Sequence, residues 1–161
     1  MKCIHIVGRK NHGKTTLLVE LVEELVRRGL AVGVVKHSKH IHELDIPGKD
    51  SHRLRQAGGH PVAVASADLI GIFLPRRADE DFYRRLEPLF AECDIVLVEG
   101  HIDGDGPKIE VWRAAVGNTC LAHTRDDILA VVSDDRPEVS VPVWSRSDVR
   151  ALAERVRSLV D

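Results

Sequence analysis

A glycine-rich segment, Gly8–Thr15, constrains the fold of this chain more than any other feature. It reads GRKNHGKT and matches the pattern G-x-x-x-x-G-K-[ST] at each fixed position. An apolar run over 2–7 precedes it, and a helical pattern over 14–28 follows it. Glycines let such a backbone curl so that successive N–H groups face phosphate oxygens, and a helix N-terminus attracts the same anion. We therefore predict a phosphate-binding loop between a buried strand and a helix.

The loop residues predict how a nucleoside triphosphate is held. We assign phosphate binding to the last residues of the loop and the first of the helix: Asn11, His12, Gly13, Lys14, Thr15 and Thr16. Lys14 would also neutralise charge on the β- and γ-phosphates, so we count it as catalytic, and the Thr15 hydroxyl would ligate Mg²⁺. The alternative is a glycine-rich turn before an ordinary helix, but the flanking elements favour the nucleotide site.

Apolar periodicity predicts an α/β fold. Helical spacing puts six apolar residues on one face of the first helix: Leu17, Leu18, Leu21, Val22, Leu25 and Val26. A second apolar strand follows over 31–35. This order favours parallel pairing through a right-handed crossover. Further strands are expected over 95–98, 108–112, 128–132 and 141–144. We predict a P-loop NTPase-type, mainly parallel sheet flanked by helices in three layers, as a single domain over 1–161.

The region between the second strand and residue 95 reads as more irregular. The polar segment 36–48 has no periodicity and predicts a loop, and a short helix is expected over 50–57. Two apolar runs, 61–65 and 69–74, predict strands that form a hairpin at the edge of the sheet.

Two helices are expected in the second half of the chain. One covers 78–93, where Pro88 predicts a kink or a break. The other closes the chain up to Val160, with Ser147 as its N-cap.

An acidic residue ends the strand over 95–98, where a P-loop site needs one to hold the Mg²⁺ shell. Glu99 stands at the end of the apolar run, and Gly100 leaves room for phosphate beside it. The alternative is a solvated carboxylate that closes a strand. Given the phosphate loop, we predict that Glu99 and Thr15 form the metal side of the site. Asp94 precedes the strand and should lie at the opposite edge.

The segment after the second strand gathers acids and histidines at the edge where open α/β sheets bind ligands. Asp45 and Asp50 flank a Pro-Gly turn, and either could sense the γ-phosphate or orient water. The alternative is an acidic loop with a capped helix start. His37, His40 and His42 have three readings: zinc ligands, an anion contact, and a solvated loop. Anion contact ranks ahead of zinc because no second cluster has a matching spacing.

Composition excludes several classes of function. The formal net charge is −2 at pH 7, so no basic field points to nucleic acid. No apolar stretch approaches the roughly 20 residues that cross a bilayer. Cys3, Cys93 and Cys120 lie far apart, which fits a reducing compartment better than a disulfide framework. We expect a cytoplasmic protein with no nucleic-acid or membrane partner.

Several motifs together resemble the molybdopterin-guanine dinucleotide biosynthesis protein B (MobB) family. They are the phosphate loop, the strand end Lys36-His37, the segment Asp45–Ser51, and the runs Val98–Gly100 and Pro107–Val111. The phosphate loop alone is not specific, whereas the Lys-His strand end followed by the Pro-Gly-Lys-Asp-Ser segment is much more so. The likeness spans most of the chain.

The resemblance implies a GTP-binding protein with weak Mg²⁺-dependent GTPase activity, usually a homodimer. The family assists a MobA-type guanylyltransferase that attaches GMP to molybdopterin, and molybdopterin itself stays open as a ligand. By position, Asp45 and Asp50 would face the γ-phosphate and Glu99 would be the acidic strand end. The chain departs from the family after Gly100, where a lysine is expected and His101-Ile102 stands. This departure concerns a loop that faces a partner or substrate.

Acidic residues near strand ends are candidates for contacting the base, because no Asn-Lys-x-Asp guanine signature is present. Segments 124–127 and 133–135 both qualify. We prefer Asp134, which follows the strand over 128–132 at its carboxyl end; the alternative is an exposed loop aspartate. A second class of function also stays open, an ATP-dependent small-molecule kinase or ligase on the same fold, which would need an acceptor pocket and a lid.

Overall fold

The computed structural model describes residues 1–77 and 80–160, and the chain divides into two compact units. The first comprises Met1–Ser38 and the chain from Glu87 onward, and the second comprises Lys39–Leu86. The first unit contains the phosphate loop, and the second is inserted in the sequence between two of its strands. The single domain over 1–161 stays a prediction beside this division. No helix in the part of the chain that the structure describes has the length and apolar character to cross a membrane.

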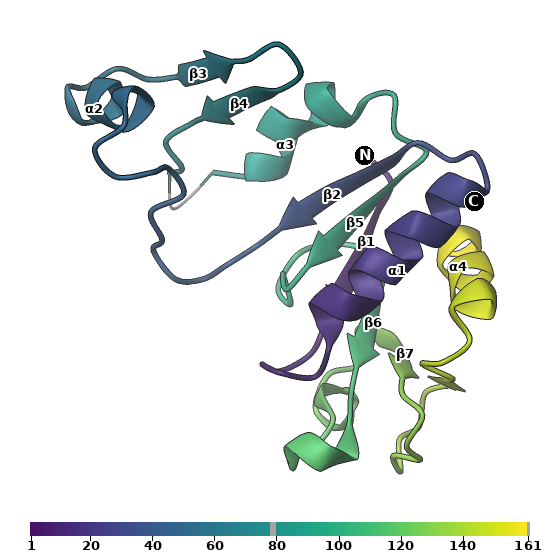
Figure 1. Ribbon diagram of the computed structural model, residues 1–161. Coiled ribbons are helices and arrows are strands. Elements are labelled where there is room, and N and C mark those ends of the chain that lie inside the picture. The colour runs from purple at the N-terminus through teal and green to yellow at the C-terminus, as the bar shows by residue number, and fades with distance from the viewer. Residues whose placement is uncertain (78–79, 161) are drawn as a thin grey trace. The chain divides into compact units, whose positions relative to one another are not determined.

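A six-stranded sheet with the order β2-β5-β1-β6-β7-β8 forms the centre of the first unit (Figure 1). All of its neighbouring strands are parallel. The strands are β1 (Cys3–Val7), β2 (Val32–Lys36), β5 (Ile95–Glu99), β6 (Lys108–Val111), β7 (Ile128–Val132) and β8 (Val143–Trp144). The predicted α/β class with a mainly parallel sheet is confirmed. Since the strands are parallel, their carboxyl ends meet at one edge, where ligands bind in such sheets.

Two helices, α1 (Lys14–Arg27) and α4 (Val149–Ser158), lie side by side against one face of this sheet (Figure 1). The helical spacing of Leu17, Leu21 and Leu25 turns all three side chains inward, and each is fully buried. They pack with Ile4 and Ile6 of β1 in the main hydrophobic core. The predicted first helix is confirmed, and its apolar face is confirmed except at Val26, which is 54% exposed because it lies at the margin of the buried stripe.

The other face of the sheet is covered by short 3₁₀ helices and by a loop. Phe90, in the 3₁₀ helix Glu87–Phe90, lies so close to β2 that a Cβ on Gly33 would be 2.4 Å from its ring. The connection between β5 and β6 returns past β1, where the Nε2 atom of His5 lies 2.7 Å from the carbonyl oxygen of Asp105. The first unit therefore has three layers: two α-helices, the six-stranded sheet, and a layer of loop and short 3₁₀ helices on the other face.

The second unit contains α2 (Asp50–Gln56), β3 (Val62–Ala65), β4 (Ile70–Phe73) and α3 (Phe82–Leu86). β3 and β4 pair antiparallel, so the predicted hairpin is confirmed. Its predicted place is wrong, because the two strands form a sheet of their own and not an edge of the six-stranded sheet. A short apolar run predicts a strand, but its periodicity contains nothing about which sheet the strand joins.

Two predictions about helix ends have different outcomes. The predicted break near Pro88 is confirmed, since α3 ends at Leu86 and Pro88 lies in a 3₁₀ helix; the predicted start at 78 lies outside the described residues. Ser147 as the N-cap of the last helix is wrong. Asp148 caps α4, because its carboxylate accepts a hydrogen bond from the Ala151 N–H at 3.0 Å.

The buried face of α1 predicts that truncating one of its core side chains destabilises the protein. Leu21→Ala removes a fully buried side chain from the main core, so we expect the free energy of unfolding to fall by about 2–5 kcal/mol. Urea denaturation followed by circular dichroism measures this loss. Val19→Ala on the same helix is the matched control, because Val19 is 51% exposed and its truncation should change stability little. Equal losses in the two variants would contradict the described packing.

Candidate functional site

The phosphate loop joins β1 to α1 at the carboxyl edge of the sheet, in a conformation that few residues adopt. The φ angles of Gly8, Asn11 and Gly13 are all positive, at 139°, 69° and 90°. A Cβ on Gly8 would lie 2.5 Å from the carbonyl oxygen of Val111, so a glycine is required where the loop meets the end of β6. Gly13 is also the N-cap of α1 and provides no side-chain cap, which leaves the first N–H groups of the helix for an anion.

The two residues predicted for the metal side lie together. The Thr15 hydroxyl donates a hydrogen bond to the Oε1 atom of Glu99 at 2.7 Å, and the Lys36 ammonium lies 3.6 Å from Oε2. Glu99 is only 8% exposed although it carries a carboxylate. A hydroxyl and a carboxylate beside a phosphate loop are the hard oxygen ligands that Mg²⁺ takes in triphosphate sites. The residues present therefore fit a magnesium ion.

Lys14 reaches back across its own loop. Its ammonium donates a hydrogen bond to the carbonyl oxygen of Arg9 at 2.7 Å. Burial lowers the pKa of Lys14; the Glu99 carboxylate opposes this shift, and the Lys36 ammonium adds to it. A phosphate group in the loop would supply the negative charge that this arrangement lacks, which suits the predicted role of Lys14.

The His12 side chain is turned into the protein and onto β6. Its ring is 1% exposed, and its Nδ1 atom accepts a hydrogen bond from the Arg113 N–H at 3.0 Å. This bond requires a neutral ring with the proton on Nε2, which is buried without a partner among the described residues. Burial above all, and then the charges of Lys14, Arg113 and Arg9, lower the pKa of His12. The phosphate-loop motif could not predict the burial of His12 or its bond to Arg113, because residue 12 is one of the positions at which the motif accepts any residue.

The two candidates for the base contact lie at opposite edges of the sheet. Asp134 follows β7 at the carboxyl edge, where its Oδ1 atom accepts hydrogen bonds from the Ser147 N–H at 3.0 Å and the Ser145 hydroxyl at 2.8 Å. These bonds lower the pKa of Asp134. Asp127 precedes β7 and pairs with Lys108 at 3.1 Å and Arg125 at 2.8 Å. The structure thus separates segment 124–127 from the phosphate loop.

Asp45 and Asp50 belong to the second unit. The Oδ1 atom of Asp45 accepts hydrogen bonds from the Ser51 hydroxyl at 3.0 Å and the Ile46 N–H at 2.8 Å, so Asp45 orders the start of α2. Asp50 is the first residue of α2, and its side chain is 97% exposed. Their action at the γ-phosphate stays a prediction.

The histidine cluster is split between the two units. His37 stacks on His101 with ring centroids 4.0 Å apart in the first unit, whereas His40 and His42 meet edge to face at 6.0 Å in the second. Over residues 1–77 and 80–160, no group of three or more His, Cys, Asp or Glu side chains is arranged to hold a metal ion. The zinc reading therefore has no support in the geometry.

Comparison with known proteins gives consistent results at the levels of family, sequence and structure. The family model "Molybdopterin guanine dinucleotide synthesis protein B" (MobB) matches residues 3–134. The chain belongs to the MobB family. It is 38% identical to the molybdopterin-guanine dinucleotide biosynthesis adapter protein of Haemophilus influenzae over 157 residues, covering 95% of this chain and 86% of the relative.

Two further comparisons agree with this family. The chain is 33% identical to the molybdopterin-guanine dinucleotide biosynthesis adapter protein of Escherichia coli over 150 residues, which covers 89% of this chain and 85% of the relative. The crystal structure of a MobB homologue from Bacillus stearothermophilus superposes with a TM-score of 0.69 at 28% identity, covering 98% and 99% of the two chains. The fold of this chain is thus the fold of solved MobB structures.

Sequence reasoning missed two buried charged residues of β6 in this MobB-family chain. Lys108 is 4% exposed and Glu110 is 1% exposed. The Glu110 carboxylate accepts hydrogen bonds from the N–H groups of Leu121 at 2.8 Å and Ala122 at 3.0 Å, where a 3₁₀ helix begins. The spacing of the two charges was a signal that sequence reasoning could have used. Residues 108 and 110 are two apart in a strand, so their side chains lie on the same face of the sheet.

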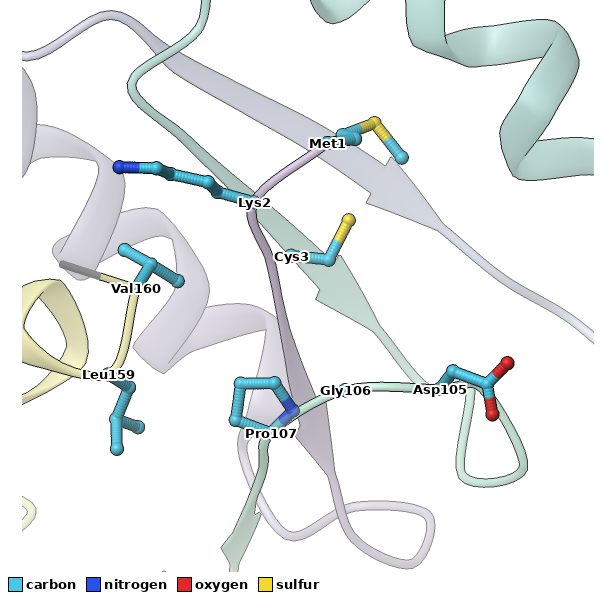
Figure 2. Close-up of a pocket in the computed structure, with 8 residues that line it drawn as sticks. All are labelled: Met1, Lys2, Cys3, Asp105, Gly106, Pro107, Leu159 and Val160. Atoms are coloured by element: carbon cyan, nitrogen blue, oxygen red, sulfur yellow. The ribbon is translucent and has the colours of Figure 1, made fainter.

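A hollow of about 260 Å³ lies at the opposite edge of the sheet from the phosphate loop (Figure 2). The start of β1, the segment before β6 and the chain end after α4 form its walls, with the residues Met1, Lys2, Cys3, Asp105, Gly106, Pro107, Leu159 and Val160. In a parallel sheet this edge contains the amino ends of the strands, so the hollow is separate from the nucleotide site.

The lowered pKa of His12 predicts a loss of stability in acid. The unfolded chain takes up the His12 proton near pH 6.5, above the folded pKa, so stability present above about pH 6.5 is lost as the pH falls below it. His5 contributes with the same sign, because burial lowers its pKa too. We expect His12→Asn to flatten the decrease in unfolding free energy between about pH 7 and 5, by at most about 1.4 kcal/mol per pH unit.

Urea denaturation at several pH values measures this slope. The control is His123→Asn, since His123 is exposed and its replacement should leave the wild-type slope in place. Identical slopes for His12→Asn and the wild type would contradict the buried, neutral His12 described above.

Proposed function

We propose that this chain is a GTP-binding adapter with weak Mg²⁺-dependent GTPase activity in the biosynthesis of molybdopterin-guanine dinucleotide. It would act beside a MobA-type guanylyltransferase that transfers GMP to molybdopterin, and molybdopterin itself is a possible further ligand. The observation that carries the proposal is the contact of Thr15 with Glu99 at the mouth of the glycine loop, 2.7 Å between oxygens. The two curated relatives described above are named adapter proteins, which supports the biosynthetic role.

The chemistry proposed for the site is positioning and charge neutralisation. The N–H groups of the loop and of the first turn of α1 would bind phosphate oxygens, and Lys14 would exchange the Arg9 carbonyl for the β- and γ-phosphates. Thr15 and Glu99 would hold Mg²⁺, which neutralises charge on those phosphates when bound. We keep Asp45 and Asp50 as the residues proposed to orient water. Without covalent chemistry, such a site suits slow hydrolysis regulated by a partner.

Guanine recognition is proposed for Asp134. It lies at the carboxyl end of β7, two strands from β1, and its hydrogen bonds with Ser145 and Ser147 fix the carboxylate in an ionised state. An ionised carboxylate accepts the two N–H donors of a guanine edge, which adenine lacks in that arrangement. The ATP-dependent kinase or ligase is the second candidate function, and the nucleotide preference distinguishes the two.

A homodimer through the hairpin of the second unit is also proposed. Apolar side chains of this hairpin are exposed to an unusual degree: Val64 43%, Leu69 72%, Ile70 73% and Ile72 46%. The strand register puts Ile70 and Ile72 on one face of the hairpin, and exposed apolar side chains that share a face are typical of an interface. A cytoplasmic location is proposed with this function, because the substrates of such a reaction are nucleotides and the cysteines are free thiols.

Nucleotide titration tests the proposed site. We expect the wild type to bind a GTP analogue with Mg²⁺ more tightly than without Mg²⁺, and more tightly than an ATP analogue. Lys14→Ala should weaken GTP binding by roughly 10- to 100-fold, since a charge-assisted bond to phosphate is lost. Lys2→Ala at the opposite edge of the sheet is the matched control. Preference for ATP would favour the kinase or ligase, and no binding of either nucleotide would refute the site.

Sedimentation of a hairpin variant tests the proposed dimer. Ile70→Glu places a charge beside the exposed Ile72 on one face of the hairpin, so we expect the variant to sediment as a monomer and the wild type as a dimer. Val26→Glu on α1, where Val26 is 54% exposed, should leave the dimer intact. A wild type that sediments as a monomer would rule this interface out.

A further inference from the structure

We infer that Arg113 is a second cation for the phosphates of the bound nucleotide, on the side of the loop opposite the metal, and that His12 is the positioning residue that holds it there. The inference rests on the proposed nucleotide binding and adds a residue that the phosphate-loop motif does not contain. Three observations support it: the place of the guanidinium, the absence of a carboxylate partner for it in the part of the chain that the structure describes, and the bond between His12 and Arg113.

The Arg113 guanidinium stands at the wall of the phosphate loop. Arg113 lies just beyond β6 with an extended backbone, φ −140° and ψ 128°. Its Nη1 atom is 3.8 Å from the position that a Cβ on Gly13 would take. Gly13 is the last glycine of the loop and directly precedes Lys14. An anion in the loop would therefore have the guanidinium beside it.

Arg113 is exposed, and its guanidinium has no acidic partner within 1–77 and 80–160, in contrast to the guanidinium groups of Arg146 and Arg125. Among the described residues, no hydrogen bond or ion pair involves its guanidinium, and its one hydrogen bond is made by its backbone N–H. Arg146 instead donates two hydrogen bonds to Glu20, at 2.7 and 2.9 Å, and Arg125 pairs with Asp127 at 2.8 Å. An unpaired planar fork with five donors beside an anion site suits a phosphate group.

His12 makes the loop and the end of β6 one rigid piece. Its Nδ1 atom holds the Arg113 N–H at 3.0 Å, and its ring is 1% exposed. Four residues earlier, the close approach of Gly8 to the carbonyl oxygen of Val111 fixes the other end of the loop on the same strand. The backbone from which the Arg113 side chain projects is therefore held at a constant distance from the phosphate-binding N–H groups.

The sheet order indicates which phosphate Arg113 faces. Glu99 ends β5 and Arg113 follows β6, and these two strands flank β1 on opposite sides. Thr15 and Glu99 would hold Mg²⁺ on the β5 side of the loop, which would draw the terminal phosphates of a bound nucleotide to that side and leave its α-phosphate toward β6. Asp134, the proposed base contact, follows β7 on that same side. Arg113 should therefore bind di- and triphosphates alike, which is uniform binding and adds nothing to the hydrolytic step.

Binding and hydrolysis measured on Arg113→Gln test this inference. We expect the affinities for GTP and GDP to fall by the same factor, roughly tenfold or more, while kcat for GTP hydrolysis stays within about twofold of the wild type. The control is Arg27→Gln, because Arg27 lies at the far end of α1, about 20 Å along the helix from the loop.

The outcomes separate this inference from the proposed function. If the wild type binds GTP and Arg113→Gln binds it equally well, the role of Arg113 is refuted and the nucleotide site stands. A loss confined to GTP together with a lower kcat would refute the α-phosphate side. A wild type that binds no nucleotide refutes both proposals.

Two substitutions of His12 test its positioning role. His12→Asn retains an acceptor near the place of Nδ1, whereas His12→Leu has a similar volume and no acceptor. We expect His12→Leu to weaken GTP and GDP binding about as much as Arg113→Gln, and His12→Asn to restore it. The double variant His12→Leu, Arg113→Gln should bind no more weakly than Arg113→Gln alone. Additive losses, or equal losses in the two His12 variants, would overturn the positioning role, and thermal unfolding checks that each variant is folded.

Discussion

The close approach of Gly8 to the carbonyl oxygen of Val111 is the constraint on which the rest of the site depends. A side chain at Gly8 would lie 2.5 Å from that oxygen, so the loop can rest on β6 only without one. From this support the chain turns through the positive φ angles of Asn11 and Gly13 into α1. The turn brings Thr15 beside Glu99 on one side and His12 beside Arg113 on the other. One steric requirement thus places both walls of the phosphate site.

The second face of the sheet explains why charged residues are buried in a strand. This face is covered by a loop and by 3₁₀ helices. In a long α-helix most backbone N–H groups bond to carbonyl groups of the same helix, whereas N–H groups in loops and short 3₁₀ helices need other acceptors. Glu110 accepts two of these N–H groups, and Lys108 lies between Asp127 and the carbonyl oxygen of Gly106, at 3.1 and 3.3 Å. Removing one partner would leave an unsatisfied buried group, so these charges are part of the fold and not of the nucleotide site.

Most of the fold and part of the site could be predicted from the sequence, for a physical reason. The strands, α1 and the contact of Thr15 with Glu99 follow from local periodicity and from a motif with strict spacing. Three features could not be predicted: the separate sheet of the hairpin, the cap by Asp148 and the inward orientation of the His12 side chain. Each depends on which of several tertiary contacts forms, and local sequence does not determine that. His12 and Arg113 are 101 residues apart in sequence, and no local pattern connects them. Ser147, the expected cap, is already bonded to Asp134.

The chain leaves the six-stranded sheet for the second unit at the end of β2, beside Glu99. Lys36, the last residue of β2, is the register partner of Glu99, and its ammonium lies 3.6 Å from the Glu99 carboxylate. The second unit begins at Lys39, three residues further along. In the function proposed above, a protein bound to the second unit is therefore separated along the chain by two residues, His37 and Ser38, from the lysine that lies beside the predicted Mg²⁺ ligand.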